Sequence, residues 1–495
     1  MKALLVYPQY PDTFWSFKYA LKLIAKKSIY PPLGLLTVAA MLPGDWEKKL
    51  VDMNVTGLTD EAILWADYVF ISAMQVQTKS VKEVISRCNT LNRKIVAGGP
   101  LFTHSYDEFS GVSHFVLGEA EITLPLFLSD LEKGCAKPMY ETAERPELNN
   151  TPLPLWSLIN MKDYSSMNIQ YSRGCPYDCE FCDIVSLYGH RPRTKNAAQL
   201  TGELDILYEQ KWRGQVFIVD DNFIGNKKKL KAEILPAIIE WSKKKNYPFY
   251  FLTEASIDLA DDEELMALMI EAGFSQVFIG IESPNKESLD ECNKIPNKSR
   301  DMSSAVIRLQ NHGFEVQGGF IIGFDNDPDS IFEEQIDFIQ KSGIVVAMVG
   351  LLNIPRGSRL YQRLKKENRL LDEVYGDNTD STIHYVPNMD HDKLINGYKH
   401  VLDTIYSPAY YYMRVQQFYK EYHPHWKSSS RVEWNYITSF IKSAWILGVI
   451  ESGRGYFWRL LLFTLFKYPG FFWTSVSFYI YRRHFYRQTR RLMAI

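Results

Sequence analysis

The sequence predicts an α/β protein in which an open doubly wound domain is followed by a partial (β/α)6 barrel and a mostly helical C-terminal domain. Short apolar runs typical of buried parallel strands alternate with helical segments over residues 1–135 and again over residues 166–355. This alternation is lost after about residue 360. We therefore predict domains at residues 1–140, 166–358 and 359–495, with a linker at 141–165, where the stretch AERPELNNTPLPLW is rich in Pro and Asn.

The first domain is predicted from four apolar runs and the helical segments between them. The expected strands cover residues 2–8, 48–55, 67–74 and 93–100, and the helical segments include residues 33–42 and 80–91. Strand–helix alternation at this spacing is typical of a doubly wound parallel sheet. We expect its ligands beyond the carboxyl ends of the strands, where sheets of this kind bind them.

The second domain is predicted from six further strands with helical segments between them, such as residues 261–273. The expected strands cover residues 167–173, 214–220, 248–254, 275–281, 315–323 and 347–354. Six β/α units favour a partial barrel over a second open sheet. A barrel of this kind places its chemistry at the carboxyl ends of its strands.

Composition excludes several classes of protein. The 495 residues carry a net charge of −2, so no basic field indicates a nucleic-acid partner. The six cysteines lack regular spacing, which favours a reducing cytoplasm over a disulfide framework. The start, MKALLVYPQYPD, lacks the features of a signal peptide. Charges at Arg459 and Lys467 interrupt the longest apolar stretch, so we expect no membrane span.

Three of the six cysteines, Cys175, Cys179 and Cys182, lie within eight residues in the stretch RGCPYDCEFCDI. Their spacing, Cys-x3-Cys-x2-Cys, follows the first expected barrel strand. Three thiolates on one loop suit zinc or an iron–sulfur cluster. Structural zinc needs a fourth ligand, for which His190 is the nearest candidate, and buried structural cysteines are a further alternative. A [4Fe–4S] cluster held by three cysteines leaves one iron open.

The cysteine motif, with Phe181 before its last cysteine, resembles that of the radical S-adenosylmethionine superfamily, and the resemblance covers residues 166–355. It implies that Cys175, Cys179 and Cys182 ligate a [4Fe–4S] cluster whose open iron binds S-adenosylmethionine. It also implies that one electron from the cluster cleaves this cofactor to methionine and a 5′-deoxyadenosyl radical.

The same resemblance implies contacts to S-adenosylmethionine from the ends of several strands. The candidates are Phe181, Asp220, Asp221, Asn222, Glu254, Glu282 and Gly323. The stretch VDDNF, residues 219–223, differs from the commoner Gly-Gly-Glu of the family, and helix capping is an alternative role for its polar residues. Glu254 and Glu282 could instead pair with a barrel Arg or Lys. Gly323 could instead mark a strand bend.

The N-terminal domain resembles that of the cobalamin-binding subclass of this superfamily. The resemblance implies a site for cobalamin at Ser72, Met74, Gln75, Gly98, Gly99, Gly118 and Glu119. The Asp-x-His-x-x-Gly motif that supplies a histidine to cobalt in related domains is absent, so Met74 or Gln75 is expected to approach the metal instead. A flavodoxin-like domain with structural glycines and no corrin is the alternative.

Over most of its length the chain resembles the group of hopanoid C-2 methylases and their uncharacterised relatives. The resemblance implies a C-methyltransferase that acts on an unactivated carbon of a lipid-like or apolar substrate, with a low-potential electron donor such as ferredoxin or flavodoxin. One alternative is a radical cyclase, ring-rearranging or carbon–carbon coupling enzyme. Another is a non-catalytic iron–sulfur or zinc module.

The C-terminal domain is dense in aromatic residues, as in YSPAYYYMRVQQFYKEYHPHW and FFWTSVSFYIYRRHFYRQTRR. One interpretation is a helical cap that closes the barrel mouth. The other is an apolar, basic-edged surface that meets the inner membrane face or a lipid-like substrate. The basic edge is expected from Arg482, Arg483, Arg487, Arg490 and Arg491.

Overall fold

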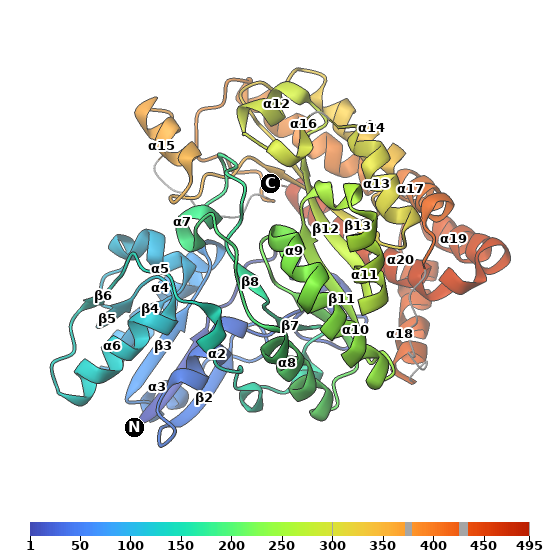
Figure 1. Ribbon diagram of the computed structural model, residues 1–495. Helices are drawn as coiled ribbons and strands as arrows, with labels where there is room; N and C mark the ends of the chain where they lie inside the picture. The colour runs from blue at the N-terminus through green and yellow to red at the C-terminus, as the bar shows by residue number, and fades with distance from the viewer. Residues whose placement is uncertain (299, 372–378, 425–433, 495) are drawn as a thin grey trace.

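The computed structural model describes residues 1–298, 300–371, 379–424 and 434–494. Its N-terminal part is a six-stranded parallel sheet with the order β2-β1-β3-β4-β5-β6 (Figure 1). The strands are β1 (Lys2–Tyr7), β2 (Glu47–Asp52), β3 (Tyr68–Ser72), β4 (Lys94–Gly98), β5 (His114–Val116) and β6 (Met139–Tyr140). The four expected strands are therefore confirmed. The last two are too short, at three and two residues, for a hydrophobic pattern to reveal them.

Helices cover both faces of this sheet, so the predicted doubly wound architecture is confirmed. On β1, Leu4 belongs to one apolar core and Leu5 to another, because successive side chains point to opposite faces. The first core is completed by α3 (Asp60–Trp65), α4 (Thr78–Thr90) and α5 (Pro100–Ser105), and the second by α2 (Leu33–Met41) and α6 (Ala120–Glu132).

The second sheet is an open, curved barrel of six parallel strands in the order β7-β10-β11-β12-β13-β14. The strands are β7 (Met167–Ile169), β10 (Gly214–Ile218), β11 (Phe249–Ala255), β12 (Phe274–Glu282), β13 (Glu315–Ile322) and β14 (Ala347–Leu351). Its chief outer helices are α8 (Ala197–Glu209), α10 (Leu235–Lys244), α11 (Glu263–Ala272), α13 (Met302–Asn311) and α14 (Ile331–Ser342). The partial (β/α)6 barrel is thus confirmed.

The first barrel strand is shorter than expected. The residues that follow it, β8 (Ser172–Arg173), pair antiparallel with β9 (Arg193–Thr194). This two-stranded ribbon closes the base of the loop that carries the three clustered cysteines. The loop also contains a short helix, α7 (Ile184–Tyr188).

The C-terminal region is helical, as predicted. Its helices are α15 (Arg359–Lys366), α16 (His391–Ile405), α17 (Pro408–Glu421), α18 (Trp434–Trp445), α19 (Arg454–Lys467) and α20 (Phe472–Leu492). Both α16 and α17 pack on α14, at the outside of the barrel. Helix α20 returns to the N-terminal segment, where the rings of Phe485 and Phe14 stack at 4.2 Å. In the described part of the chain, no helix has the length and apolar character that crossing a bilayer requires.

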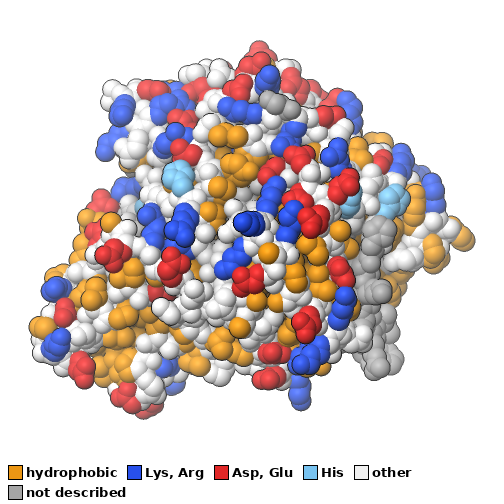
Figure 2. Space-filling view, in the orientation of Figure 1, with side chains coloured by type: hydrophobic (Ala, Val, Ile, Leu, Met, Phe, Trp, Pro, Cys, Tyr) orange, Lys and Arg blue, Asp and Glu red, His pale blue; other side chains and the backbone are white. Residues whose placement is uncertain are grey.

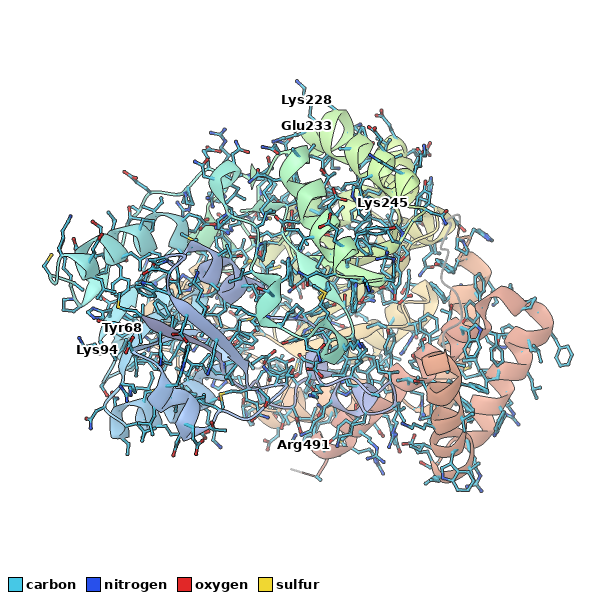
Figure 3. The ribbon with its side chains drawn as sticks, turned by 90° about the horizontal axis from the view of Figure 1, so that it is seen from below. Tyr68, Lys94, Lys228, Glu233, Lys245 and Arg491 are labelled. Atoms are coloured by element: carbon cyan, nitrogen blue, oxygen red, sulfur yellow. The ribbon has the colours of Figure 1, made fainter. Side chains whose placement is uncertain are left out.

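The prediction that Arg482 and Arg483 belong to an exposed basic edge is wrong. Arg482 is only 1% exposed, and Arg483 pairs with Glu451 at 2.8 Å. The reason is that α20 packs against α1 (Lys18–Leu21), α16 and α19, so it has little free surface. Arg487, Arg490 and Arg491 are exposed, and Figure 3 shows Arg491 at an outer edge of the molecule. Residues 425 and 426 of the aromatic stretch lie outside the described residues.

Candidate active site

A cavity of about 1820 Å³ lies between the two sheets and the C-terminal helices. Both sheets, the N-terminal segment that holds Tyr10, Trp15 and Tyr30, and helices α18 and α20 contribute to its wall. Sites for drug-sized molecules occupy roughly 300–1,000 Å³. The cavity therefore has room for a large cofactor together with a substrate.

Inward-facing side chains of the barrel strands form one side of the cavity. On β11 they are Tyr250, Leu252 and Glu254, and on β12 they include Gln276 and Phe278. Every second residue faces inward because neighbouring side chains of a strand alternate between its two faces. The cavity thus runs through the inside of the partial barrel.

The carboxyl ends of the N-terminal strands form the facing wall. Of the residues predicted to contact cobalamin, Ser72, Met74, Gly98, Gly99, Gly118 and Glu119 all line the cavity. The opposite ends of two of these strands, marked by Tyr68 and Lys94, lie at the outer edge of the domain in Figure 3. The sheet therefore directs only the carboxyl ends of its strands towards the cavity, as expected for a doubly wound fold.

The two glycines after β4 are required by close contacts. A Cβ at Gly98 would lie 2.6 Å from the backbone oxygen of Val116. Gly99 has a φ of 87° and a ψ of −175°, a conformation that is essentially confined to glycine. A side chain at Gly99 would also collide with Ser72. The backbone itself therefore forms this part of the wall, which suits close approach by a large ligand.

The remaining predicted cobalamin residues have different surroundings. Met74 is 47% exposed and lines the cavity, whereas Gln75 is not part of the wall. Glu119 is engaged in ion pairs, since its carboxylate lies 2.7 Å from Arg173 and 2.7 Å from Arg193. These two arginines flank the cysteine loop, on β8 and β9. Glu119 therefore connects the N-terminal domain to the base of that loop.

The cysteine loop, residues 174–192, is held at several points. Gly174 has a φ of 97°, and a Cβ there would lie 2.8 Å from the backbone oxygen of Gly189. The backbone nitrogen of Cys175 donates to that same oxygen at 3.2 Å. Farther along, Glu180 is bound by Arg363 of α15 at 2.8 Å. The loop is thus anchored both at its base and by the C-terminal region.

The thiols on this loop have the chemistry required of cluster ligands. Cys175, Cys179 and Cys182 are all free and partly buried. Burial raises the pKa of each thiol, so binding of a metal centre there releases protons. Among the described residues, no three His, Cys, Asp or Glu side chains converge to hold a single metal ion. In a [4Fe–4S] cluster the cysteines bind different irons, so their thiolates need not meet at one point. His190 is exposed.

The three polar residues that follow β10 have different surroundings. Asp220 is 1% exposed and accepts hydrogen bonds from the backbone nitrogens of Tyr171 and Ser172 at 2.8 and 2.7 Å. Its carboxylate therefore stabilises the chain that leads into the cysteine loop. Asn222 donates from Nδ2 towards the sulfur of Cys175, at 4.0 Å. Asp221 differs from both, because its buried Oδ2 has no hydrogen-bond partner.

Asp221 and Glu254 are two half-buried carboxyl groups that form no direct ion pair among the described residues, although the charges of Arg173 and Lys294 lower the pKa of Asp221 and Glu254 respectively. Burial, together with the charge of Asp220, raises the pKa of Asp221 to about 7. Burial, together with the charge of Asp221, raises the pKa of Glu254 to about 8. Within the described residues, no hydrogen bond or ion pair engages the side chain of Glu254. Buried carboxyl groups of this kind favour a cationic ligand.

The other predicted contacts of S-adenosylmethionine have partners within the protein. Glu282 pairs with Lys294 at 2.6 Å, which is the alternative left open by the sequence. Gly323 has a φ of 112°, and Tyr385 donates a hydrogen bond to its backbone oxygen at 2.5 Å. The ring of Phe181 lies 6.2 Å from that of Phe324. The role of these residues towards a cofactor stays a prediction.

Sequence reasoning missed Lys294, Arg173 and Arg193. Burial alone would lower the pKa of Lys294, but Glu282 and the thiol of Cys179 raise it overall. The only signal for Lys294 was the unpaired glutamate at the end of a barrel strand, which required a partner of opposite charge. Arg173 directly precedes the Gly-Cys pair of the motif, so its place in the chain was a signal for a role at the loop.

Known protein families match the chain in three consecutive segments. Family models match for a B12 binding domain at residues 23–128, the radical SAM superfamily at 169–339 and a domain of unknown function, DUF4070, at 358–494. The chain is 40% identical to an uncharacterised methyltransferase of Synechocystis sp. over 99% of this chain and 93% of that protein. It is 32% identical to the hopanoid C-2 methylase of Rhodopseudomonas palustris over 82% of this chain and 77% of that enzyme.

Two solved structures share the fold of the whole chain. One is the cobalamin-dependent S-adenosylmethionine radical enzyme OxsB with aqua-cobalamin bound, at 14% identity and a TM-score of 0.63, covering 100% of this chain and 80% of that one. The other is the radical S-adenosylmethionine methyltransferase TsrM of Kitasatospora setae with cobalamin and a [4Fe–4S] cluster bound. It has 14% identity and a TM-score of 0.63, and the match covers 100% of both chains.

Proposed function

The chain belongs to the cobalamin-dependent radical S-adenosylmethionine methyltransferases, and from that premise we propose that it methylates an unactivated carbon of an apolar, lipid-like substrate. The observation that carries the proposal is the single cavity of about 1820 Å³ that is lined both by the glycine loops of the N-terminal sheet and by the inside of the barrel. When bound, the cofactors supply a 5′-deoxyadenosyl radical and a transferable methyl group.

In this proposal, Cys175, Cys179 and Cys182 hold the [4Fe–4S] cluster. The donor set fits, because three free thiols lie on one anchored loop and thiolate is the usual ligand of iron–sulfur clusters. Asn222 lies beside Cys175 and orients the site. A low-potential electron donor such as ferredoxin or flavodoxin provides the reducing electron.

Asp221 and Glu254 are proposed to bind the cationic groups of S-adenosylmethionine. This assignment rests on the unpartnered Oδ2 of Asp221 and on the raised pKa of both carboxyl groups. A sulfonium or ammonium group beside them would favour their ionised forms. Asp220, whose carboxylate is engaged by the backbone of Tyr171 and Ser172, is proposed to position this site without touching the cofactor.

Cobalamin is proposed to lie against the N-terminal wall, over Ser72, Gly98, Gly99 and Gly118. Met74, whose exposed side chain lines the cavity, would be the residue to approach the cobalamin. His104 contacts Asp183 at 3.5 Å, and His114 contacts the backbone oxygen of Lys137 at 2.7 Å, so each has a partner outside the cavity wall.

The substrate class is inferred from the remaining wall of the cavity. Trp15, Phe17, Phe278, Phe440 and Trp473 line it, and these aromatic side chains suit a large apolar molecule. One relative is named for the methylation of a hopanoid, which is an apolar lipid. We propose a cytoplasmic protein that works beside the inner membrane face, because such a substrate has little solubility in water.

The test is anaerobic turnover of the reconstituted full-length enzyme with a low-potential reductant, cobalamin and S-adenosylmethionine carrying a labelled methyl group. A detergent-solubilised lipid extract serves as the source of substrate. We expect S-adenosylhomocysteine and 5′-deoxyadenosine to form together and the label to enter the lipid fraction.

Omission of cobalamin is the matched control. We expect it to abolish S-adenosylhomocysteine formation and labelling, while cleavage to 5′-deoxyadenosine continues. Formation of 5′-deoxyadenosine alone in the complete reaction would contradict methyl transfer and favour a cyclase or a carbon–carbon coupling enzyme. Zinc without sulfide in the anaerobically purified protein would favour a binding module instead.

A further inference from the structure

An exposed apolar face lies on the outer C-terminal helices and has no role in the site described above. On α19 it consists of Trp458, Leu462, Leu465 and Phe466, which are 42%, 52%, 51% and 83% exposed. Their spacing of three and four residues places them on one side of the helix. Figure 2 shows apolar side chains at the right-hand edge of the molecule, over this helix.

Further exposed apolar side chains lie on α18 and on the π-helical turn that follows it. Ile441 and Trp445, one helical turn apart, are 61% and 62% exposed, and Ile450 is 61% exposed. Trp458 connects α19 to this turn, because its indole nitrogen donates a hydrogen bond to the backbone oxygen of Gly448 at 2.9 Å. We call the residues on α18, the turn and α19 together the outer apolar face.

Exposed basic side chains without acidic partners lie on the same helices as the outer apolar face. Lys442, Arg454, Arg459 and Lys467 are exposed, and within the described residues none of them forms an ion pair with Asp or Glu. The acidic residue of this region, Glu451, is already bound by Arg483 at 2.8 Å. The face therefore combines apolar and aromatic side chains with uncompensated positive charge, which is the combination that binds anionic lipid surfaces.

The outer apolar face is also next to the large cavity. Phe440, Lys442 and Trp473 line the cavity from α18 and α20, and Lys442 and Trp473 are at the same time exposed. The rings of Phe440 and Trp473 meet edge to face at 5.7 Å. Helix α18 therefore carries both residues of the outer apolar face and residues of the cavity wall.

We propose that the outer apolar face docks on an anionic lipid bilayer and that the cavity receives its substrate from that bilayer between α18 and α20. The second part rests on the proposed function, since it requires an apolar substrate. The docking itself does not, because it depends only on the surface of the folded chain.

The test is co-sedimentation of the full-length protein with vesicles of phosphatidylcholine and with vesicles of equimolar phosphatidylcholine and phosphatidylglycerol. We expect binding to the anionic vesicles that weakens as salt concentration rises. The variant L462Q/L465Q/F466Q should lose about tenfold or more in affinity, because binding scales with buried apolar area. The matched control is L64Q/L126Q/L153Q, which removes three exposed leucines from elsewhere in the chain and should bind as the wild type.

Charge reversal tests the electrostatic part. The variant K442E/K467E should bind anionic vesicles about tenfold or more weakly. The control K228E/K244E changes two exposed lysines of the barrel helices, and Figure 3 shows Lys228 far from the C-terminal helices. Equal binding of all variants, or no binding by the wild type, would overturn the proposal. A dimer in solution that L462Q/L465Q/F466Q dissociates would show that a second copy covers the face instead.

Turnover separates this proposal from the proposed function. Methyl transfer to substrate in vesicles should fall in L462Q/L465Q/F466Q and be retained with detergent-solubilised substrate. Loss of vesicle binding with unchanged turnover in vesicles would refute the route from the bilayer. Absence of methyl transfer under all conditions would refute the proposed function and leave the docking result intact.

Discussion

The two parallel sheets bring different chemistry to the cavity that they share. At the carboxyl ends of the N-terminal strands the wall is glycine and small polar side chains, such as Gly98, Gly99 and Ser72. At the corresponding ends of the barrel strands lie thiols and carboxyl groups, such as Cys175, Asp221 and Glu254, and of these three only Glu254 lines the cavity. The same strand geometry thus provides a close-fitting backbone surface on one side and ligating, charged groups on the other. In the proposed function, the N-terminal sheet binds its cofactor by shape, and the barrel binds its cofactors through thiolate ligands and charge.

The largest expected effect follows from removal of a thiol on the barrel side. C179A should lose the cluster and all methyl transfer, because two cysteines cannot replace three iron ligands. Iron and sulfide content and the visible spectrum of anaerobically reconstituted protein are the measurements. C135A, which removes an exposed free cysteine of the N-terminal domain, is the control and should retain both. Full iron content in C179A would show that the barrel loop does not hold the cluster.

The second-largest effect is expected from Glu119, which connects the N-terminal domain to the barrel. E119Q should lower the free energy of unfolding by about 3 kcal/mol, because it leaves the buried Arg193 without a carboxylate partner. Urea unfolding of the protein without cofactors measures this loss. E132Q, at an exposed position of the same domain, should change stability by less than about 0.5 kcal/mol. An equally small change in E119Q would mean that the two sides are held together by other contacts.

A substitution on the N-terminal side tests binding by shape. G99A should destabilise the protein by about 1–3 kcal/mol, because Ala is strained in this backbone conformation, and should prevent cobalamin retention. The cobalamin spectrum per mole of purified protein is the readout. G134A also places Ala at a positive φ, of 71°, but in open space, and should retain cobalamin. Equal retention in the two variants would contradict a role of the Gly99 backbone in the site.

The smallest effect concerns the carboxyl group on the barrel side. Burial raises the pKa of Glu254 to about 8 from its ordinary value near 4.5. The folded state therefore binds this proton more tightly than the unfolded state, and stability falls as pH rises from 4.5 towards 8. E254Q should be more stable than the wild type by about 1.4 kcal/mol at pH 5.5, one unit above the ordinary pKa, and the difference should grow as pH rises towards 8 and vanish below pH 4.5.

Thermal unfolding across this pH range, without cofactors, checks the prediction for Glu254. E263Q, at an exposed position, is the control and should follow the wild type at every pH. A stability difference for E254Q that does not vary with pH would show that Glu254 is ionised in the folded protein.

Much of the architecture could be predicted because hydrophobic patterning is local. Every barrel strand and four of the six N-terminal strands were found from runs of seven to nine residues. The exceptions, β5 and β6, are too short to carry a pattern. The ribbon of β8 and β9 was missed because antiparallel pairing of two residues leaves no periodic signal.

The roles of charged residues were harder to predict, because they depend on partners far away in the chain. Glu119 was expected at cobalamin and lines the cavity, but its ion pairs with the arginines at positions 173 and 193 were not expected. Arg482 was expected at the surface but lies buried, since three other helices surround α20. In both cases the identity of the neighbour decides the role, and the neighbour is absent from the local sequence.

The sequence by itself determined the order of the domains and the grouping of three thiols on one loop, because strand periodicity and cysteine spacing are properties of short segments. The tertiary structure alone decided that the glycine loops and the barrel interior share one cavity and that Asp221 and Glu254 form no direct ion pair among the described residues. It also decided that α18 and α19 expose an apolar face while α17 and α20 bury theirs. Burial and ion pairing depend on which surfaces meet, and only the packing of distant segments establishes that.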